Sequence, residues 1–332
     1  MTSNRRRNEQ ELFFERLRTF GADEWRAALG AGQEEAALWT EAAAKYGIVD
    51  AQLYWAQMLL DGRGVPPDAE AAFRWFAIAA KSQRADAFNM LGRCHELGWG
   101  VPRNPAEAAL LYQAAASKGD DWAKFNLAGL LLDGVGVARD VDEAFRLYLA
   151  AADRGHAKAM TMVARFFLEG WGRAPDPALA GAWLQRASDS GDFRADYHLG
   201  RIALQAGEIE TAAEWFARAI EHATIAFCGD VAPSWFASPY PAIKAVGLRA
   251  FERACEAGGV SDLRAYALAL QGAAVSAEEQ AAAKEAWQRA EALARALERK
   301  AAVAQRQPKA GIAAKLASLG AAITRSRTQA SS

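Results

Sequence analysis

A glycine pair that recurs every 36 residues constrains the fold of this chain more than any other feature. The first glycines are Gly62, Gly98, Gly134 and Gly170, and the second glycines follow two positions later at Gly64, Gly100, Gly136 and Gly172. A fixed period of this length is typical of arrays in which each repeat is one supersecondary unit stacked on its neighbours. The chain is therefore expected to form a repeat array.

Two other kinds of column keep the same period. A short polar column is expected to cap helix N-termini; it consists of Asp68, Asn104, Asp140 and Asp176. Two alanine columns that begin at Ala72 and Ala79 are seven residues apart, so each pair lies on one helix face and lets a neighbouring helix approach closely. Each repeat is thus predicted as a helix, a Gly-x-Gly loop and a second helix.

Residues 91–102, with the sequence LGRCHELGWGVP, and the following Asn104, Ala108, Tyr112 and Gly119 resemble the Sel1-like repeat, a relative of the tetratricopeptide repeat. The resemblance covers about residues 36–221 and implies an all-α, right-handed α-α superhelix with a helical C-terminal cap.

The pattern divides the chain into six segments. They are an N-terminal capping helix (1–31), Sel1-like repeats (32–191), a degenerate tetratricopeptide-like helix pair (192–222), a loop rich in proline and aromatic residues (223–243), C-terminal helices (244–304) and a basic tail (305–332). The loop is interpreted either as a plug over the last helix pair or as a docking segment that uses Trp235, Phe236 and Tyr240. The plug is favoured, because an exposed aromatic cluster invites aggregation.

The basic tail carries one apolar stripe, made by Ile312, Leu316, Leu319 and Ile323. Residues 309–327 are therefore a candidate amphipathic helix for an anionic membrane surface or a partner groove. A disordered, solvated tail is the favoured alternative.

Charge and cysteine content exclude several classes of protein. The net charge is -1, which gives the molecule no nucleic-acid footprint. The three cysteines have unrelated spacings and do not form a disulfide framework, and the N-terminal stretch lacks the apolar core of a signal peptide. A reducing, cytoplasmic location is the simplest expectation.

The sequence contains no recognisable catalytic set, and no cofactor or metal is expected. Cys94 and His95 are adjacent, so on a helix they point about 100° apart and are poorly placed to chelate one metal. Both share columns with apolar residues of other repeats and are predicted to belong to the core. The weak candidate for a catalytic cluster is Tyr197, His198 and Arg201.

A partner is expected on the concave face, which the first helix of each repeat lines in related solenoids. Columns at positions 86, 90 and 93 and their copies should point inward. The predicted partner-binding residues are Tyr54, Arg93, Trp122, Asn126, Lys158, Arg165, Arg194, His198 and Arg201.

Charge in these columns changes from acidic near the N-terminus to basic further on. Asn126 with its basic neighbours loosely resembles the carboxylate-holding residues of peptide-binding tetratricopeptide grooves. Alternatively, the arginines only pair with Asp196, Glu169 or Asp133, each pair contributing about 0–1 kcal/mol.

The favoured function is that of a non-enzymatic adaptor or scaffold whose concave surface binds a protein or peptide, with an acidic partner as the chemistry that fits best. A membrane-associated regulator that acts through the basic tail is the second hypothesis, and an enzyme is the third and weakest.

Overall fold

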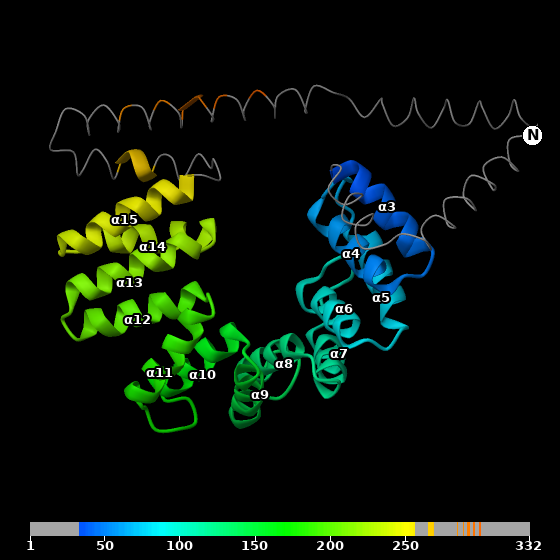
Figure 1. Ribbon diagram of the computed structural model, residues 1–332, viewed down its shortest axis with the longest axis horizontal. Coiled ribbons are helices and arrows are strands. Elements are labelled where there is room, and N and C mark those ends of the chain that lie inside the picture. Colours follow the sequence, from blue (N-terminus) through cyan, green and yellow to red (C-terminus); the bar gives the residue numbers. More distant parts are fainter. Residues whose placement is uncertain are drawn as a thin grey trace, which may run out of the picture. The chain divides into compact units, whose positions relative to one another are not determined.

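The computed structural model describes residues 33–255 and 265–268, together with separate helical positions between 284 and 299. Figure 1 shows that the regular elements of residues 33–255 are all α-helices, which follow one another in tandem. This confirms the all-α solenoid prediction. The chain divides into two compact units, Met1–Ala195 and Asp196–Ser332.

In the part of the first unit that the structure describes, residues 33–195, four complete helix pairs follow one further helix. These helices are α3 (Gln33–Lys45), α4 (Val49–Asp61), α5 (Ala69–Ala80), α6 (Ala85–Leu97), α7 (Pro105–Ser117), α8 (Asp121–Asp133), α9 (Val141–Asp153), α10 (Ala157–Glu169) and α11 (Pro177–Asp189). Helix α12 (Phe193–Gln205) begins in this unit and continues into the second. The pairs α4/α5, α6/α7, α8/α9 and α10/α11 are called repeats 1 to 4 below.

The two glycines of each Gly-x-Gly loop have different roles. The first ends a helix in the left-handed conformation: Gly98 has φ of 75° and donates its N–H to the carbonyl of Cys94. The second packs against the preceding repeat, because a Cβ on Gly100 would overlap the carbonyl group of Ala69 at the start of α5. The loop of repeat 2 therefore rests directly on the second helix of repeat 1.

The polar column caps the second helices as predicted. Each side chain accepts a hydrogen bond from the backbone N–H three residues later; for Asp68 and Ala71 the distance is 2.8 Å. The same bond is made by Asn104, Asp140 and Asp176. These acceptors satisfy donors that the first helical turn would otherwise leave unpaired.

Within a repeat, small residues on the first helix make room for large ones on the second. Tyr112 of α7 is fully buried, and a Cβ on Gly92 of α6 would lie only 2.7 Å from its Cε1 atom. Cys94 is also fully buried, as predicted, and burial raises the pKa of its thiol to about 12. The thiol is therefore an apolar packing group.

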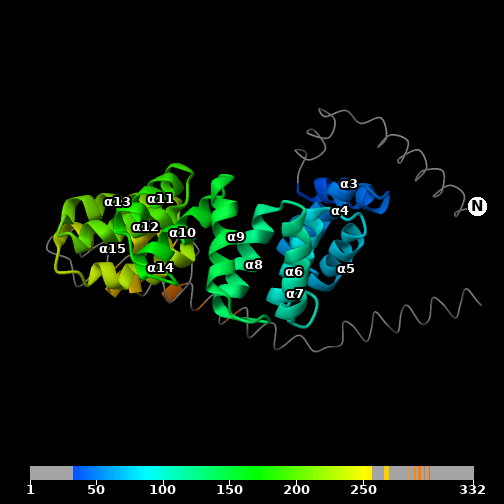
Figure 2. The ribbon, with the colours of Figure 1, turned by 90° about the horizontal axis from the view of Figure 1, so that it is seen from below.

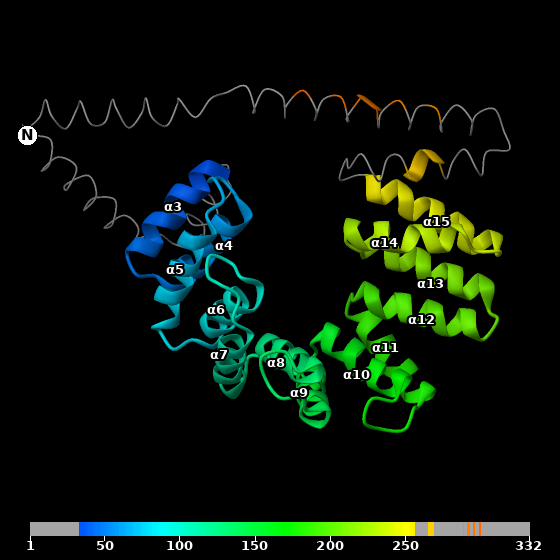
Figure 3. The ribbon, with the colours of Figure 1, turned by 180° about the vertical axis from the view of Figure 1, so that it is seen from behind.

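The first helices of neighbouring repeats lie next to each other in the first unit. Helix α6 contacts α8 directly. In Figures 1 and 3, α6 and α8 lie along the inner side of this unit's curve, and α7 and α9 lie along the outer side. Figure 2 shows the same helices from below.

The second unit differs from the prediction at residues 223–243, where α14 (Ile225–Phe236) replaces the expected loop. The neighbours of α14 along the chain are α13 (Ile209–His222) and α15 (Pro241–Ala254). Thr224 caps α14 through its side chain, and Pro233 lies in the last turn of the helix, where it removes only one backbone donor. Pro241 occupies the first turn of α15, a position that tolerates proline. The prolines thus mark helix ends and not a continuous loop.

Several predicted features lie outside the described residues. These are the capping helix at 1–31, the basic tail at 305–332 with its candidate membrane-binding segment at 309–327, and most of the C-terminal helices beyond residue 255. No helix among the described residues combines the length and the apolar character needed to cross a membrane.

Candidate functional site

Seven of the nine predicted partner-binding residues belong to the first unit. They are Tyr54 on α4, Arg93 on α6, Trp122 and Asn126 on α8, Lys158 and Arg165 on α10, and Arg194 on α12. Tyr54 and Trp122 expose 43% and 49% of their surface, so large aromatic side chains face solvent among these cations. His198 and Arg201 belong to the second unit.

The same arrangement of three side chains holds the arginines of repeats 2 and 4. The Arg93 guanidinium lies 4.8 Å from the ring centre of Trp99 and contacts the Met90 sulfur at 3.7 Å. Two repeats further along the chain, Arg165 makes the corresponding contacts with Trp171 (4.8 Å) and with the Met162 sulfur (3.6 Å). A ring face and a sulfur orient an arginine without neutralising it, because neither carries a charge.

The two tryptophans were not predicted from the sequence. Trp99 and Trp171 occupy the middle position of their Gly-x-Gly loops, and they occur in the repeats that have arginine in the inward column. The sequence alone therefore shows that tryptophan in the loop accompanies arginine in the inward column, and this pattern could have identified the pairs. In repeat 1 the roles are exchanged, since Arg63 occupies the loop position and lies 5.3 Å from the Tyr54 ring.

The acidic and basic ends of the inward columns differ in how far their charges are paired. Arg84 binds Asp50 and Asp86 at 2.6 Å each, and these carboxylates raise the pKa of the guanidinium. In contrast, no carboxylate of the described residues lies within ion-pairing distance of Arg93 or Arg165. The predicted charge trend is therefore sharpened: the acidic end is neutralised within the protein, whereas Arg165 at the basic end is not.

Lys158 is a third cation of this kind and lies in an aromatic cluster. Its ammonium group is 4.9 Å from the ring centre of Trp122, and the His156 ring meets that indole edge-on at 4.5 Å. Phe125 stacks on His156 at 5.1 Å. Burial, and then the nearby Arg194, lower the pKa of Lys158. Arg194 itself lies 3.7 Å from Asp192.

His156 caps helix α10 and should make the stability of this region depend on pH. Its Nδ1 accepts the Ala159 N–H at 3.1 Å, which requires a neutral ring. Burial, then Lys158, lower the pKa of His156 below 6.5, although Asp121 and Asp192 oppose the shift. Because the folded-state pKa lies below the unfolded one, the stabilisation is complete above pH 6.5 and is lost as the pH falls through the folded-state value.

We therefore expect the unfolding free energy of the wild type, relative to that of His156→Asn, to fall between pH 7.5 and pH 5.5. A cap of this kind contributes about 1 kcal/mol. Asparagine keeps a side-chain acceptor that does not titrate in this range, so urea denaturation at both pH values isolates the histidine from the carboxylates. A difference that is constant with pH would contradict the assignment.

Asn126 is only partly available for a ligand. Its side-chain NH2 donates one hydrogen to the side-chain oxygen (Oδ1) of Asn89 at 3.0 Å, linking α8 to α6. The predicted clamp by Asn126 is thus reduced to the second hydrogen of that NH2 group and to its own side-chain oxygen.

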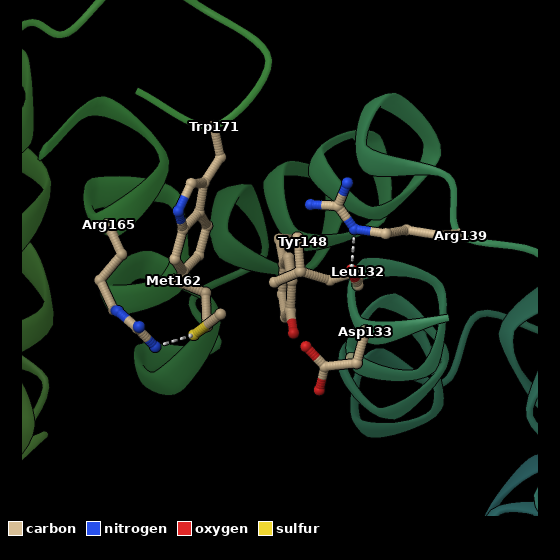
Figure 4. A pocket seen from close by; sticks show the side chains of 8 residues that line it. Leu132, Asp133, Arg139, Tyr148, Met162, Arg165 and Trp171 are labelled. Atoms are coloured by element: carbon tan, nitrogen blue, oxygen red, sulfur yellow. Dashed lines mark hydrogen bonds between the residues drawn. The ribbon is translucent and has the colours of Figure 1, made fainter. Parts of the chain in front are cut away.

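A pocket of about 460 Å³ opens between repeats 3 and 4, next to the unpaired Arg165. Its lining residues are Gly129, Leu132, Asp133, Arg139, Tyr148, Met162, Arg165 and Trp171. Figure 4 shows Arg165, Met162 and Trp171 on one wall, with Tyr148, Asp133 and Arg139 facing them. Only Arg165 was among the predicted partner-binding residues, although Gly129 and Met162 also belong to the columns predicted to point inward.

In the second unit, two of the three predicted docking residues lie within the fold. Trp235 is 7% exposed and stacks on Phe216 at 4.5 Å, so it is unavailable to a partner, and the favoured plug interpretation describes it better. Phe236 is partly buried against Phe251 at 6.1 Å. Tyr240 remains 42% exposed.

The weak catalytic candidate of the second unit, Tyr197 with His198 and Arg201, is held together by contacts to the Tyr197 ring. Tyr197 meets His198 edge-on at 5.3 Å, and the Arg201 guanidinium lies 5.9 Å from the Tyr197 ring centre. Tyr197 also packs against Phe227 of α14, and its side chain is partly buried. Among the described residues, no group of three or more histidine, cysteine or acidic side chains is arranged to hold a metal ion.

Comparisons with known proteins agree with this architecture. The Sel1 repeat family matches residues 49–83, 85–120, 123–156, 157–192 and 194–223. A Sel1 repeat protein from Oxalobacter formigenes is 24% identical, with a TM-score of 0.60 over 71% of this chain and 100% of that one. A comparison with curated proteins gave no match.

A protective antigen of uropathogenic Escherichia coli with an SLR fold is 21% identical, with a TM-score of 0.52 over 81% of this chain. The match spans 60% of the antigen's length. At these identities the solved structures show the fold alone. Because the five family matches together cover more than half of the sequence, the chain belongs to the Sel1 repeat family.

Proposed function

We propose that this chain is a non-enzymatic adaptor that binds an acidic protein or peptide on the inner face of α6, α8 and α10. Sel1 repeat proteins generally act as scaffolds for interactions between proteins. The observation that carries the proposal is that Arg93, Lys158 and Arg165 have no carboxylate partner among the described residues, although other cations of the same unit are paired.

Two cations on the second helices are paired with carboxylates of the protein, although Arg186 of α11 has no such partner among the described residues and lies 4.2 Å from the Trp183 ring centre. On the second helices, Arg74 lies 3.9 Å from Glu70, and Arg146 lies 2.5 Å from Glu143. Cations that lack an internal partner and are oriented by aromatic rings keep their hydrogen-bond donors for an external anion. Such an anion gains charge-assisted hydrogen bonds, which are stronger than neutral ones.

Exposed aromatic surface supports a protein partner. Trp122 and Tyr54 are about half exposed, and tryptophan, tyrosine and arginine are the residue types that contribute most to protein–protein interfaces. Trp122 also lies beside Lys158, so an acidic partner would meet a cation and an aromatic plane at one place.

The test compares two double variants with equal changes in charge. Lys158→Glu with Arg165→Glu reverses the inner face, and Arg74→Glu with Arg146→Glu reverses the outer face. A partner captured by the wild type and then purified should bind the inner-face variant about a hundredfold more weakly, because charge-assisted hydrogen bonds contribute about 1.5–3 kcal/mol each.

The outer-face variant should bind that purified partner like the wild type, and both variants should keep the helical circular dichroism spectrum. Equal affinity of the two variants for the partner would place the interface elsewhere and contradict the proposal. Isothermal titration calorimetry with the purified partner measures the difference.

A further inference from the structure

Gly129 opens the pocket between repeats 3 and 4, and packing does not require it. The corresponding residues of repeats 2 and 4 are Arg93 and Arg165. A Cβ on Gly129 would meet its nearest neighbour, the Tyr148 hydroxyl, at an ordinary 3.5 Å. Gly92, in contrast, is needed because a Cβ there would lie 2.7 Å from the Tyr112 ring. A glycine within a helix lowers the stability of that helix. The absence of a side chain at Gly129 leaves the space of the pocket open.

A second departure from the repeat leaves a hydroxyl at the edge of this space. In repeat 2 the Tyr112 hydroxyl donates to Glu96 at 2.5 Å. In repeat 3 the position of Glu96 is taken by Leu132, so Tyr148 has no corresponding acceptor and its hydroxyl borders the pocket. Burial, and then Asp133, raise the pKa of Tyr148, which keeps the hydroxyl protonated as a donor.

Two arginines supply further donors to the pocket. The Arg165 Nε is buried and has no hydrogen-bond partner among the described residues. Arg139 uses its Nε to hold the Leu132 carbonyl oxygen at 2.9 Å, which leaves its two terminal nitrogens for a ligand. With Asp133, the ionised side chains of the lining sum to one positive charge.

We propose that this pocket binds a glutamate or aspartate side chain of the peptide that the inner face recognises, which rests on the function proposed above. The side-chain carboxylate accepts from Arg165 and from the Tyr148 hydroxyl. Asp133 accepts a backbone N–H of the same peptide. Polyphosphates, which are also anions, have no such donor. The mixed charge of the walls therefore fits an acidic residue within a chain, and the volume admits the side chain with adjoining backbone.

The test uses arrays of nonapeptides with acetylated N-termini, amidated C-termini and randomised flanks. The central residue is glutamate, glutamine or phosphoserine, and a fourth array has central glutamine with a free C-terminal carboxylate. The wild type should retain glutamate-centred peptides at least tenfold more strongly than either glutamine array, because one charge-assisted hydrogen bond lost corresponds to about ten- to a hundredfold in affinity. It should also retain phosphoserine-centred peptides less, because Asp133 repels the second negative charge and the lining carries one net positive charge.

Filling the pocket should abolish this preference. Gly129→Arg restores the residue of repeats 2 and 4 and should remove the discrimination between glutamate and glutamine. Gln57→Arg makes the same change at the equivalent position of repeat 1, outside the pocket, and should leave it intact. Tyr148→Phe removes only the hydroxyl and should reduce the preference several-fold without lowering the melting temperature.

The results separate this inference from the adaptor function. If Lys158→Glu, which lies outside the lining, weakens peptide binding and Gly129→Arg does not, the inner face binds peptides but the pocket is not the acidic subsite. Equal retention of glutamate and glutamine, or preference for phosphoserine or a free C-terminus, also overturns the inference. Failure of the wild type to retain any peptide overturns both proposals.

Discussion

Gly100→Ala is expected to lower the free energy of unfolding by about 3 kcal/mol or more, because it combines backbone strain with a backbone collision. Gly100 has φ of 68°, where a Cβ costs about 1–2 kcal/mol. That Cβ would also lie far inside van der Waals contact of the Ala69 carbonyl group, so the loop of repeat 2 must move away from α5.

Gly119→Ala is the matched control. Gly119 has φ of 91°, but a Cβ there would meet nothing within 4 Å, so this variant should show only the backbone cost. Urea denaturation followed by circular dichroism gives the difference between the variants, which measures the contact between repeats. Equal destabilisation by both changes would mean that the second glycine of the loop serves conformation alone.

The repeat period accounts for how much of the fold could be predicted. Cap residues, left-handed glycines and small packing positions are local or nearest-neighbour requirements, so they recur at every 36th residue and can be recognised in one sequence. Cys94 illustrates this: its column is apolar in the other repeats, and the structure buries it completely. Periodicity carried less information where the repeat breaks down, and α14 was missed for that reason.

The site was predicted less completely, because its properties depend on departures from the repeat. Arg165 was predicted to face inward. The pocket beside it arises because Gly129 and Leu132 lie next to Tyr148, and the sequence does not show that these three residues are neighbours. Likewise, Asn126 of α8 is hydrogen-bonded to Asn89 of α6, although the two residues occupy different positions within their repeats. Side-chain direction decides such contacts, and spacing along the chain does not specify it.

Trp235→Ala should lower the free energy of unfolding of the second unit by about 3–5 kcal/mol, the usual cost of removing a buried aromatic side chain. Trp235 stacks on Phe216 of α13, and its ring also lies 6.2 Å from that of Tyr197 on α12. Removing it leaves a cavity between α14 and the preceding helix pair, because Phe216 is itself only 1% exposed.

Tyr240→Ala separates packing from docking in the same segment. Tyr240 is 42% exposed, so its removal should change the unfolding free energy by no more than about 0.5 kcal/mol. Thermal and urea denaturation of both variants provide the measurement. A small loss of stability in Trp235→Ala, together with weaker binding of the captured partner, would contradict the packing role and support docking through this segment. A large loss specific to Trp235 would instead mean that the proline- and aromatic-rich segment stabilises the end of the helix stack.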